Sequence, residues 1–144
     1  MNHTIRSARA RWAAGFTLVE LLVVLAILGL LAGLVGPRVL GQLDGAKTKT
    51  ATVQIKDLEQ AAELFKLDVG RFPTTAEGLN ALVQKVSVPG WNGPYLKKGL
   101  PTDPWGNPYR YENPGRNGDI DIYSYGADNA PGGEGERADI GNWN

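Results

Sequence analysis

Hydrophobic residues are concentrated in one continuous run near the start of the chain. From Phe16 to Val35 only Thr17 and Glu20 are strongly polar. A helix rises ~1.5 Å per residue, so a run of this length can cross a hydrocarbon layer ~30 Å thick. The pattern predicts a membrane-spanning helix that carries one carboxylate, on Glu20, near its start.

Beyond this run the chain becomes polar, but its apolar residues keep a helical spacing. They recur every three or four positions, at Ala51, Ile55, Leu58, Ala62, Phe65 and Val69. The spacing predicts that the helix continues to about Asp68 and ends at Gly70, which is a suitable C-cap. Pro37 lacks an N–H group and its ring clashes with the preceding turn, so we expect the helix to kink or melt locally there.

Shorter elements are predicted after the long helix. The segment Thr74-Thr75-Ala76-Glu77 has the form of a capping box and predicts a second helix. The apolar face of that helix is Leu79, Leu82, Val83 and Val86. Two short strands, "YRYE" and "DIDIYSY", are joined by the turn-rich "NPGRNG" and predict a small antiparallel sheet over the second half of the long helix. The pattern predicts an α+β fold.

Composition limits the chemistry that such a chain can carry. With 144 residues, no cysteine and a single histidine, His3, it lacks the residues for Ser/His/Asp or Cys/His catalysis and for the usual zinc sites. Asp119 and Asp121 share a strand face and form a candidate acid–base pair, but alternating acids on a strand are more typical of a solvated face. No basic stripe is present, so we expect no nucleic-acid partner.

Charge around the apolar run predicts its orientation. Arg6, Arg9 and Arg11 precede the run. By the positive-inside rule they place that side in the cytoplasm, so the chain after Pro37 is expected in the periplasm of a bacterium. A secretory signal peptide also has a basic start and an apolar run, and it remains an alternative, although its apolar core is only about 7–15 residues long.

The stretch "GFTLVELLVVLAILGLLAGLVGP" resembles the class III signal of type IV pilin-like proteins. The resemblance implies that a prepilin peptidase cuts between Gly15 and Phe16 and methylates the new N-terminal amine of Phe16. The chain then divides into a leader at 1–15, a hydrophobic transmembrane and polymerisation helix at 16–36, and a periplasmic globular domain at 37–144.

Such a cut suggests why Glu20 is tolerated in an apolar run. An ionised carboxylate is costly in hydrocarbon, and pairing it with an opposite charge lowers that cost. The new amine on Phe16 would lie four residues before Glu20, and an axial stagger between helices would let Glu20 of one chain reach the amine of the next. We therefore expect Glu20 and Phe16 to fix the register of a helical homopolymer. The alternative is a carboxylate that is protonated or reaches the cytoplasmic interface.

The last stretch, "YGADNAPGGEGERADIGNWN", is rich in acids and glycines. Asp128, Glu134, Glu136 and Asp139 offer oxygen atoms, and calcium takes six to eight oxygen ligands in flexible loop geometries. The acids do not follow the EF-hand pattern. From the residues alone, a calcium loop and a solvated acidic loop both remain open.

Four segments, "RFPTTAEGL", "DPWGNPY", "YSYGADNAPGGEGE" and "ADIGNWN", resemble the major pseudopilins of type II secretion systems over essentially all of the mature chain. The resemblance implies a pilin-like fold in which the long helix packs on a second helix, a small antiparallel sheet and a calcium-stabilised C-terminal loop. It implies a structural calcium ion held by the side chains of Asp128 and Asp139 and by the Tyr125 carbonyl, with the Ala130 carbonyl as a further candidate ligand.

The resemblance also implies a function without chemistry of its own. The subunit would leave the inner membrane and polymerise into a periplasmic pseudopilus that exports folded proteins. Its partners would be copies of itself, minor pseudopilins, the prepilin peptidase and the inner-membrane assembly platform. A pilin of a surface or DNA-uptake filament is an alternative, against which the lack of cysteine counts. A membrane-anchored calcium-binding periplasmic domain is another.

Overall fold

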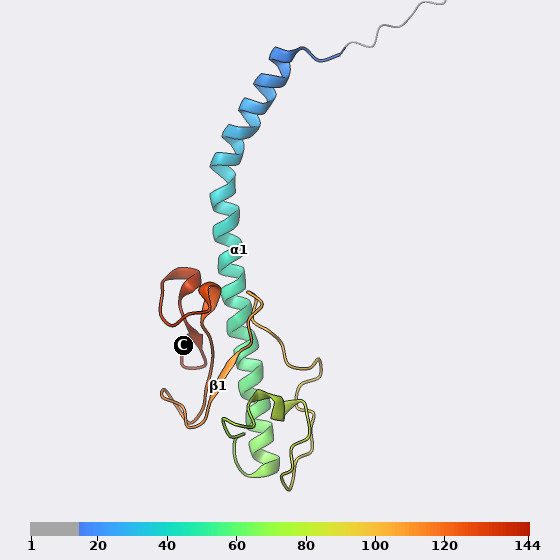
Figure 1. Ribbon diagram of the computed structural model, residues 1–144, viewed down its shortest axis with the longest axis vertical. Coiled ribbons are helices and arrows are strands. Elements are labelled where there is room, and N and C mark those ends of the chain that lie inside the picture. Colours follow the sequence, from blue (N-terminus) through green and yellow to red (C-terminus); the bar gives the residue numbers. More distant parts are fainter. Residues whose placement is uncertain (1–14) are drawn as a thin grey trace, which may run out of the picture. The chain divides into compact units, whose positions relative to one another are not determined.

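The computed structural model describes residues 15–144 (Figure 1). The predicted leader, except for Gly15, lies outside the described residues, as do His3 and the arginines on which the orientation argument rests. The chain divides into two compact units, a first that ends at Val39 and a second that spans Leu40–Asn144.

Helix α1 spans Leu18–Val69 and is 52 residues long. Its start is capped by Thr17, whose Oγ1 accepts a hydrogen bond from the Glu20 N–H at 3.2 Å. Its end is closed by Gly70, which has φ +90° and donates its N–H to the Lys66 carbonyl at 2.7 Å. The predicted long helix and its glycine cap are therefore confirmed.

Pro37 lies inside α1, which continues through it without a break. The expected local melting is therefore wrong for this chain. A proline removes a single backbone donor, and once a helix is nucleated each further residue adds its own hydrogen bond, so long helical segments on both sides hold the turn.

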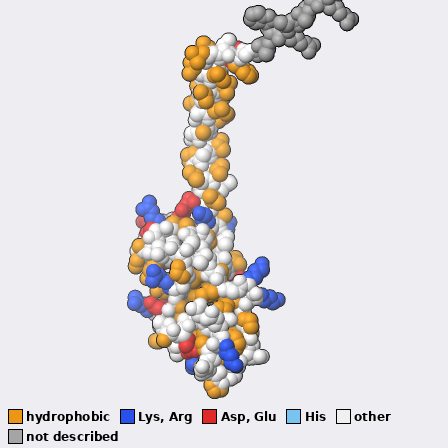
Figure 2. Space-filling view, turned by 45° about the vertical axis from the view of Figure 1, so that its right-hand side comes forward, with side chains coloured by type: hydrophobic (Ala, Val, Ile, Leu, Met, Phe, Trp, Pro, Cys, Tyr) orange, Lys and Arg blue, Asp and Glu red, His pale blue; other side chains and the backbone are white. Residues whose placement is uncertain are grey.

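In the first unit, the apolar side chains of α1 are exposed. Figure 2 shows hydrophobic side chains along this part of the helix, whereas Lys, Arg, Asp and Glu gather over the second unit. α1 contains a stretch long and apolar enough to cross a membrane, and none of that stretch is buried within the chain. No described residue packs over this apolar surface.

In the second unit, one stripe of α1 forms half of the hydrophobic core. The buried residues on this stripe are Ala51, Ile55, Leu58, Ala61, Ala62 and Phe65. The rest of the core comes from the chain that follows, namely Leu79, Ala81, Leu82, Tyr109, Ile120, Ile122 and Ile140. The apolar spacing in the sequence thus identified the face of α1 that the domain packs on.

The predicted second helix is wrong, since the structure has only a 3-10 turn, η1, at Leu79–Leu82. The capping box itself forms: the Glu77 N–H bonds Thr74 Oγ1 at 3.1 Å, and the Thr74 N–H bonds Glu77 Oε1 at 3.2 Å. The next residue, Gly78, has φ +65°, which stops a right-handed helix from following.

Tertiary contacts also prevent η1 from growing into an α-helix. In such a helix the carbonyls of Ala81 and Leu82 would accept bonds from residues four positions later. Instead Ala81 accepts from Trp91 Nε1 and Leu82 accepts from the Tyr95 N–H, both at 2.8 Å. The apolar residues of the expected helix still reach the core, because Leu79 and Leu82 are buried.

A three-stranded antiparallel sheet completes the second unit, in the order β1-β2-β3. β1 spans Arg110–Glu112, β2 spans Asp121–Ser124 and β3 spans Ile140–Gly141. β1 and β2 are the two predicted strands. β3 was not predicted. It pairs Ile140 with Ser124 and thereby closes the chain between them into a loop, which holds two further 3-10 turns, η2 (Gly126–Asp128) and η3 (Gly135–Arg137).

Phe65→Ala should strongly destabilise the second unit. Phe65 is 0% exposed in the core, and truncation of such a phenylalanine costs about 3–5 kcal/mol. Leu67→Ala is the matched control, because Leu67 lies two residues away on α1 but is 79% exposed, and it should change stability by less than about 0.5 kcal/mol. Denaturant unfolding of both variants measures the difference; equal losses would contradict the core assignment.

Candidate functional site

The residues predicted for processing and assembly lie at the N-terminal end of α1. Gly15 and Phe16 precede the helix, and Glu20 is in its first turn. Phe16 is 81% exposed. The first turn of a helix carries backbone N–H groups without helical partners and a partial positive charge, both of which favour a carboxylate there. The bond from the Glu20 N–H to Thr17 Oγ1 is an N-cap contact that was not predicted from the sequence.

The predicted calcium residues lie in the C-terminal loop, which we define as Tyr125–Asp139. The loop folds back on itself, and η2 contacts η3. At Gly126, which has φ +77°, a Cβ atom would overlap the Glu136 carbonyl oxygen and lie 2.8 Å from that of Ala138. The loop therefore requires glycine at this position, and backbone carbonyls crowd its first turn.

The two predicted aspartates each bind a backbone N–H of the same loop. Asp128 Oδ1 accepts from Ala130 at 3.2 Å, and both Asp139 oxygens lie 3.1 Å from the Gly132 nitrogen. Within residues 15–144, no three or more Asp, Glu, His or Cys side chains gather as a metal-binding group, so Glu134 and Glu136 do not complete a carboxylate cage. A cation in this loop would need backbone carbonyls beside the two aspartates, a donor set that suits calcium.

Aromatic side chains hold the start of the loop. The Tyr123 ring lies 5.3 Å from that of Tyr125 and 5.7 Å from that of Trp143, measured between centroids, and the Arg110 guanidinium lies 4.4 Å from the Tyr125 ring centre. Burial raises the pKa of Tyr123, and hydrogen bonds with Tyr125 and Glu112 raise it further. The hydroxyl of Tyr123 is therefore a neutral donor to Glu112, at 3.0 Å.

The candidate acid pair does not form. Asp119 is exposed and lies outside β2, so the two acids do not share a strand face. Asp121 is 2% exposed, which corrects the expectation of a solvated face. Its carboxylate accepts hydrogen bonds from the Arg116 and Asn117 backbone and from Asn117 Nδ2, because the turn before β2 folds back over it.

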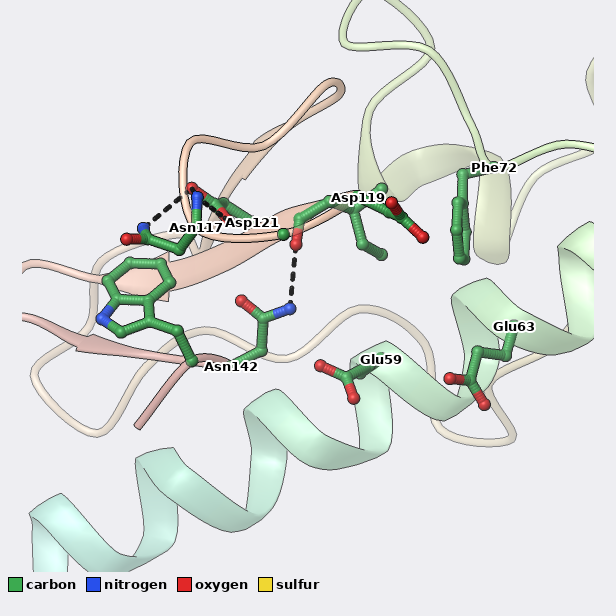
Figure 3. Close-up of a pocket in the computed structure, with 10 residues that line it drawn as sticks. Glu59, Glu63, Phe72, Asn117, Asp119, Asp121 and Asn142 are labelled. Atoms are coloured by element: carbon green, nitrogen blue, oxygen red, sulfur yellow. Dashed lines mark hydrogen bonds between the residues drawn. The ribbon is translucent and has the colours of Figure 1, made fainter.

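A solvent-open groove of about 220 Å³ lies between α1 and this turn (Figure 3). Glu59 and Glu63 from α1 and Asp119 from the turn give it negative charge, while Phe72 and Trp143 supply apolar walls. The Asn142 side chain helps to shape it by donating to the Ile120 carbonyl at 3.0 Å and accepting from the Ile122 N–H at 3.1 Å. The groove suits a basic group and not a phosphate.

Comparison with known families agrees with this fold and this N-terminus. The family model described as "Type II secretion system (T2SS), protein G" matches residues 38–143, which is more than half of the chain. The chain belongs to the type II secretion system protein G family. A second model, the prokaryotic N-terminal methylation motif, matches residues 13–36.

Individual proteins of this family are similar over nearly their whole length. The chain is 49% identical to the type II secretion system core protein G of Pseudomonas aeruginosa, with 92% of this chain and 96% of that protein covered. It is 48% identical to the corresponding protein of Vibrio cholerae, with 94% and 95% covered.

A solved structure in the family has the same fold. The crystal structure of the major pseudopilin from the type 2 secretion system of enterohaemorrhagic Escherichia coli is 39% identical and superposes with a TM-score of 0.60, covering 72% of this chain and 92% of that one. The predicted resemblance to major pseudopilins is therefore confirmed.

Asp121→Ala should destabilise the second unit by about 1–3 kcal/mol, because it removes the buried carboxylate that accepts from the Arg116 and Asn117 N–H groups and organises the turn. Asp119→Ala, two residues away and exposed, should have an effect near zero. Thermal unfolding measures both. A larger loss for Asp119→Ala than for Asp121→Ala would show that the turn is not organised around the buried carboxylate.

Proposed function

We propose that the mature chain is the repeating subunit of a type II secretion pseudopilus, anchored in the inner membrane before assembly and with its second unit in the periplasm. The observation that carries this proposal is the uncovered apolar surface of α1 before Val39. Leucine and valine side chains there are about half exposed or more. Burying such a side chain fully gains about 1.5–3 kcal/mol, so this helix requires lipid or other apolar helices around it.

A filament of identical subunits supplies those helices. Each copy has the same apolar surface, and stacking by a repeated, non-closing contact gives a helical polymer rather than a closed ring. Minor pseudopilins and the assembly platform of the inner membrane would start and drive this polymer, as in the family. In this proposal the subunit performs no catalysis, and no nucleic acid takes part.

Glu20 sets the stagger between neighbouring subunits. Prepilin peptidase would cut after Gly15 and leave an N-methylated amine on Phe16. Because Glu20 is only four residues away, in the first turn of α1, a small axial displacement brings the Glu20 carboxylate of one subunit to the amine of the next. Within an apolar bundle, the paired charges cost less than either charge alone.

Glu20→Gln should abolish filament assembly while leaving processing intact. Loss of one partner from a buried ion pair costs about 3–5 kcal/mol, because the other charge is left unpaired. Filaments would be measured by shearing and electron microscopy, and processing by mass spectrometry of the N-terminus. Asp57→Asn, which changes an exposed acid elsewhere on α1, is the control and should assemble normally. Normal fibres from Glu20→Gln, or a native chain that retains residues 1–15, would contradict the proposal.

We also propose that the C-terminal loop binds a structural calcium ion. Asp128 and Asp139 would supply carboxylate oxygens, and Tyr125 and Ala130 would supply carbonyl oxygens. The support is the donor chemistry: a glycine-rich loop with two aspartates and crowded backbone carbonyls, in a chain without cysteine. Calcium bound only to the folded loop would stabilise the domain as a cross-link does.

Calcium should therefore raise the unfolding temperature of the chain, by the equivalent of about 2.7 kcal/mol at one hundred times its dissociation constant. Asp128→Ala and Asp139→Ala should remove this increase. Asp119→Ala, an acid outside the loop, should retain it. Calorimetry in calcium and in chelator makes the measurement, and an unmodified chain that melts identically in both would exclude the structural ion.

A further inference from the structure

The buried carboxylate of Asp103, outside the C-terminal loop, is connected by hydrogen bonds to the first turn of that loop. Asp103 is 3% exposed and Ser124 is 1% exposed. Asp103 Oδ2 accepts a hydrogen bond from the Ser124 hydroxyl at 2.7 Å, and Ser124 Oγ in turn accepts from the Gly126 N–H at 3.0 Å. These contacts link the "DPWGNPY" segment to the loop across 21 residues of sequence.

The donor and the acceptor of each hydrogen bond between Asp103, Ser124 and Gly126 are fixed. The other Asp103 oxygen, Oδ1, accepts from the N–H groups of Trp105 and Asn107, at 3.0 and 2.8 Å. A backbone N–H can only donate, so Ser124 Oγ must accept from Gly126. The single hydroxyl proton of Ser124 then goes to Asp103. The buried carboxylate therefore holds the hydroxyl with its lone pair toward Gly126.

The position of the Gly126 N–H determines the direction of the Tyr125 carbonyl. Both groups belong to one planar peptide unit. This peptide bond is trans, since the cis bonds within residues 15–144 are Gly93–Pro94 and Asn113–Pro114. In a trans peptide the N–H and C=O point in opposite directions. When Ser124 holds the N–H on its own side, the Tyr125 carbonyl must point away from Ser124.

The Tyr125 residue is held from its other side as well. Its ring contacts the Arg110 guanidinium and the Tyr123 ring, while Gly126 lies against the returning chain at Glu136 and Ala138. Because the Tyr125 ring and Gly126 are both held, the peptide plane between Tyr125 and Gly126 is the part that could still rotate. The hydrogen bond from the Gly126 N–H to the Ser124 hydroxyl prevents this rotation.

From this geometry we infer that Asp103 and Ser124 are positioning residues that orient the Tyr125 carbonyl for calcium. The inference rests on the proposed calcium site and adds to it two residues that lie outside the C-terminal loop. Neither residue contacts the ion in this arrangement; they act through the Gly126 N–H and set how strongly the loop binds calcium.

The test measures calcium affinity by isothermal titration of the full mature chain in detergent. Ser124→Ala removes the hydroxyl. Asp103→Asn keeps the side-chain volume but replaces one accepting oxygen with an N–H group. Each change should weaken calcium binding about tenfold or more, in line with the loss of one buried hydrogen bond. Because Asp103 acts through Ser124, the double variant should bind no more weakly than Ser124→Ala alone.

Tyr111→Phe is the matched control. It removes another partly buried hydroxyl of the sheet, one that donates to the Pro73 carbonyl at 2.6 Å and is not part of the loop. It should lower stability and leave calcium affinity within about twofold of the unmodified chain, since uncoupled sites act independently. Equal weakening by Tyr111→Phe would mean that calcium affinity follows general stability, and would overturn the positioning role.

Amide hydrogen exchange without calcium provides a separate readout. In Ser124→Ala the Gly126 amide should lose its protection while the Asn142 amide, which donates to the Ile122 carbonyl at 3.0 Å, keeps its own, which also verifies the fold. A Gly126 amide that stays protected, or variants that bind calcium as the unmodified chain does, would overturn the inference. If the unmodified chain binds no calcium, the proposed calcium site fails, whereas the Gly126 exchange still decides whether Ser124 fixes this peptide.

Discussion

The structure depends on how the apolar surface of one long helix is covered. In the second unit, the stripe of α1 from Ala51 to Phe65 is buried by β2, by η1 and by other parts of the chain that follow the helix. In the first unit the described residues leave the apolar side chains of α1 exposed. The hydrophobic effect favours burial of both apolar surfaces of α1, but only the one in the second unit is buried within the chain. The other directs the protein to lipid and to copies of itself.

Hydrogen bonds, beside aromatic and apolar packing, organise the C-terminal part of the second unit. The turn before β2 is built around the buried Asp121 carboxylate, and the start of the C-terminal loop is held by Asp103 through Ser124. A loop this rich in glycine has a large conformational entropy to lose on folding. Pairing of β2 with β3 fixes its two ends, and the proposed calcium ion would join Asp128 to Asp139 without any disulfide.

The fold follows from the sequence where the signal is local and repeated. The extent of α1, its buried stripe and its cap at Gly70 were predicted correctly, because helical periodicity and a C-terminal glycine are read from neighbouring residues. The expected second helix was wrong, although its capping box does form at Thr74 and Glu77. There the carbonyls of Ala81 and Leu82 bind Trp91 and Tyr95, and a local pattern cannot register partners ten or more residues away.

The amino-acid sequence by itself thus determined that the chain has an apolar helix with one acid near its start, an amphipathic continuation and a small sheet, since hydropathy and spacing are properties of short windows. The burial and the hydrogen-bond partners of individual polar groups were decided only by the tertiary structure. Asp121 is buried rather than solvated because the turn before β2 folds back over it and supplies donors, and Asp103 is tied to Ser124 across 21 residues of sequence; hydropathy and spacing in a short window reveal neither contact.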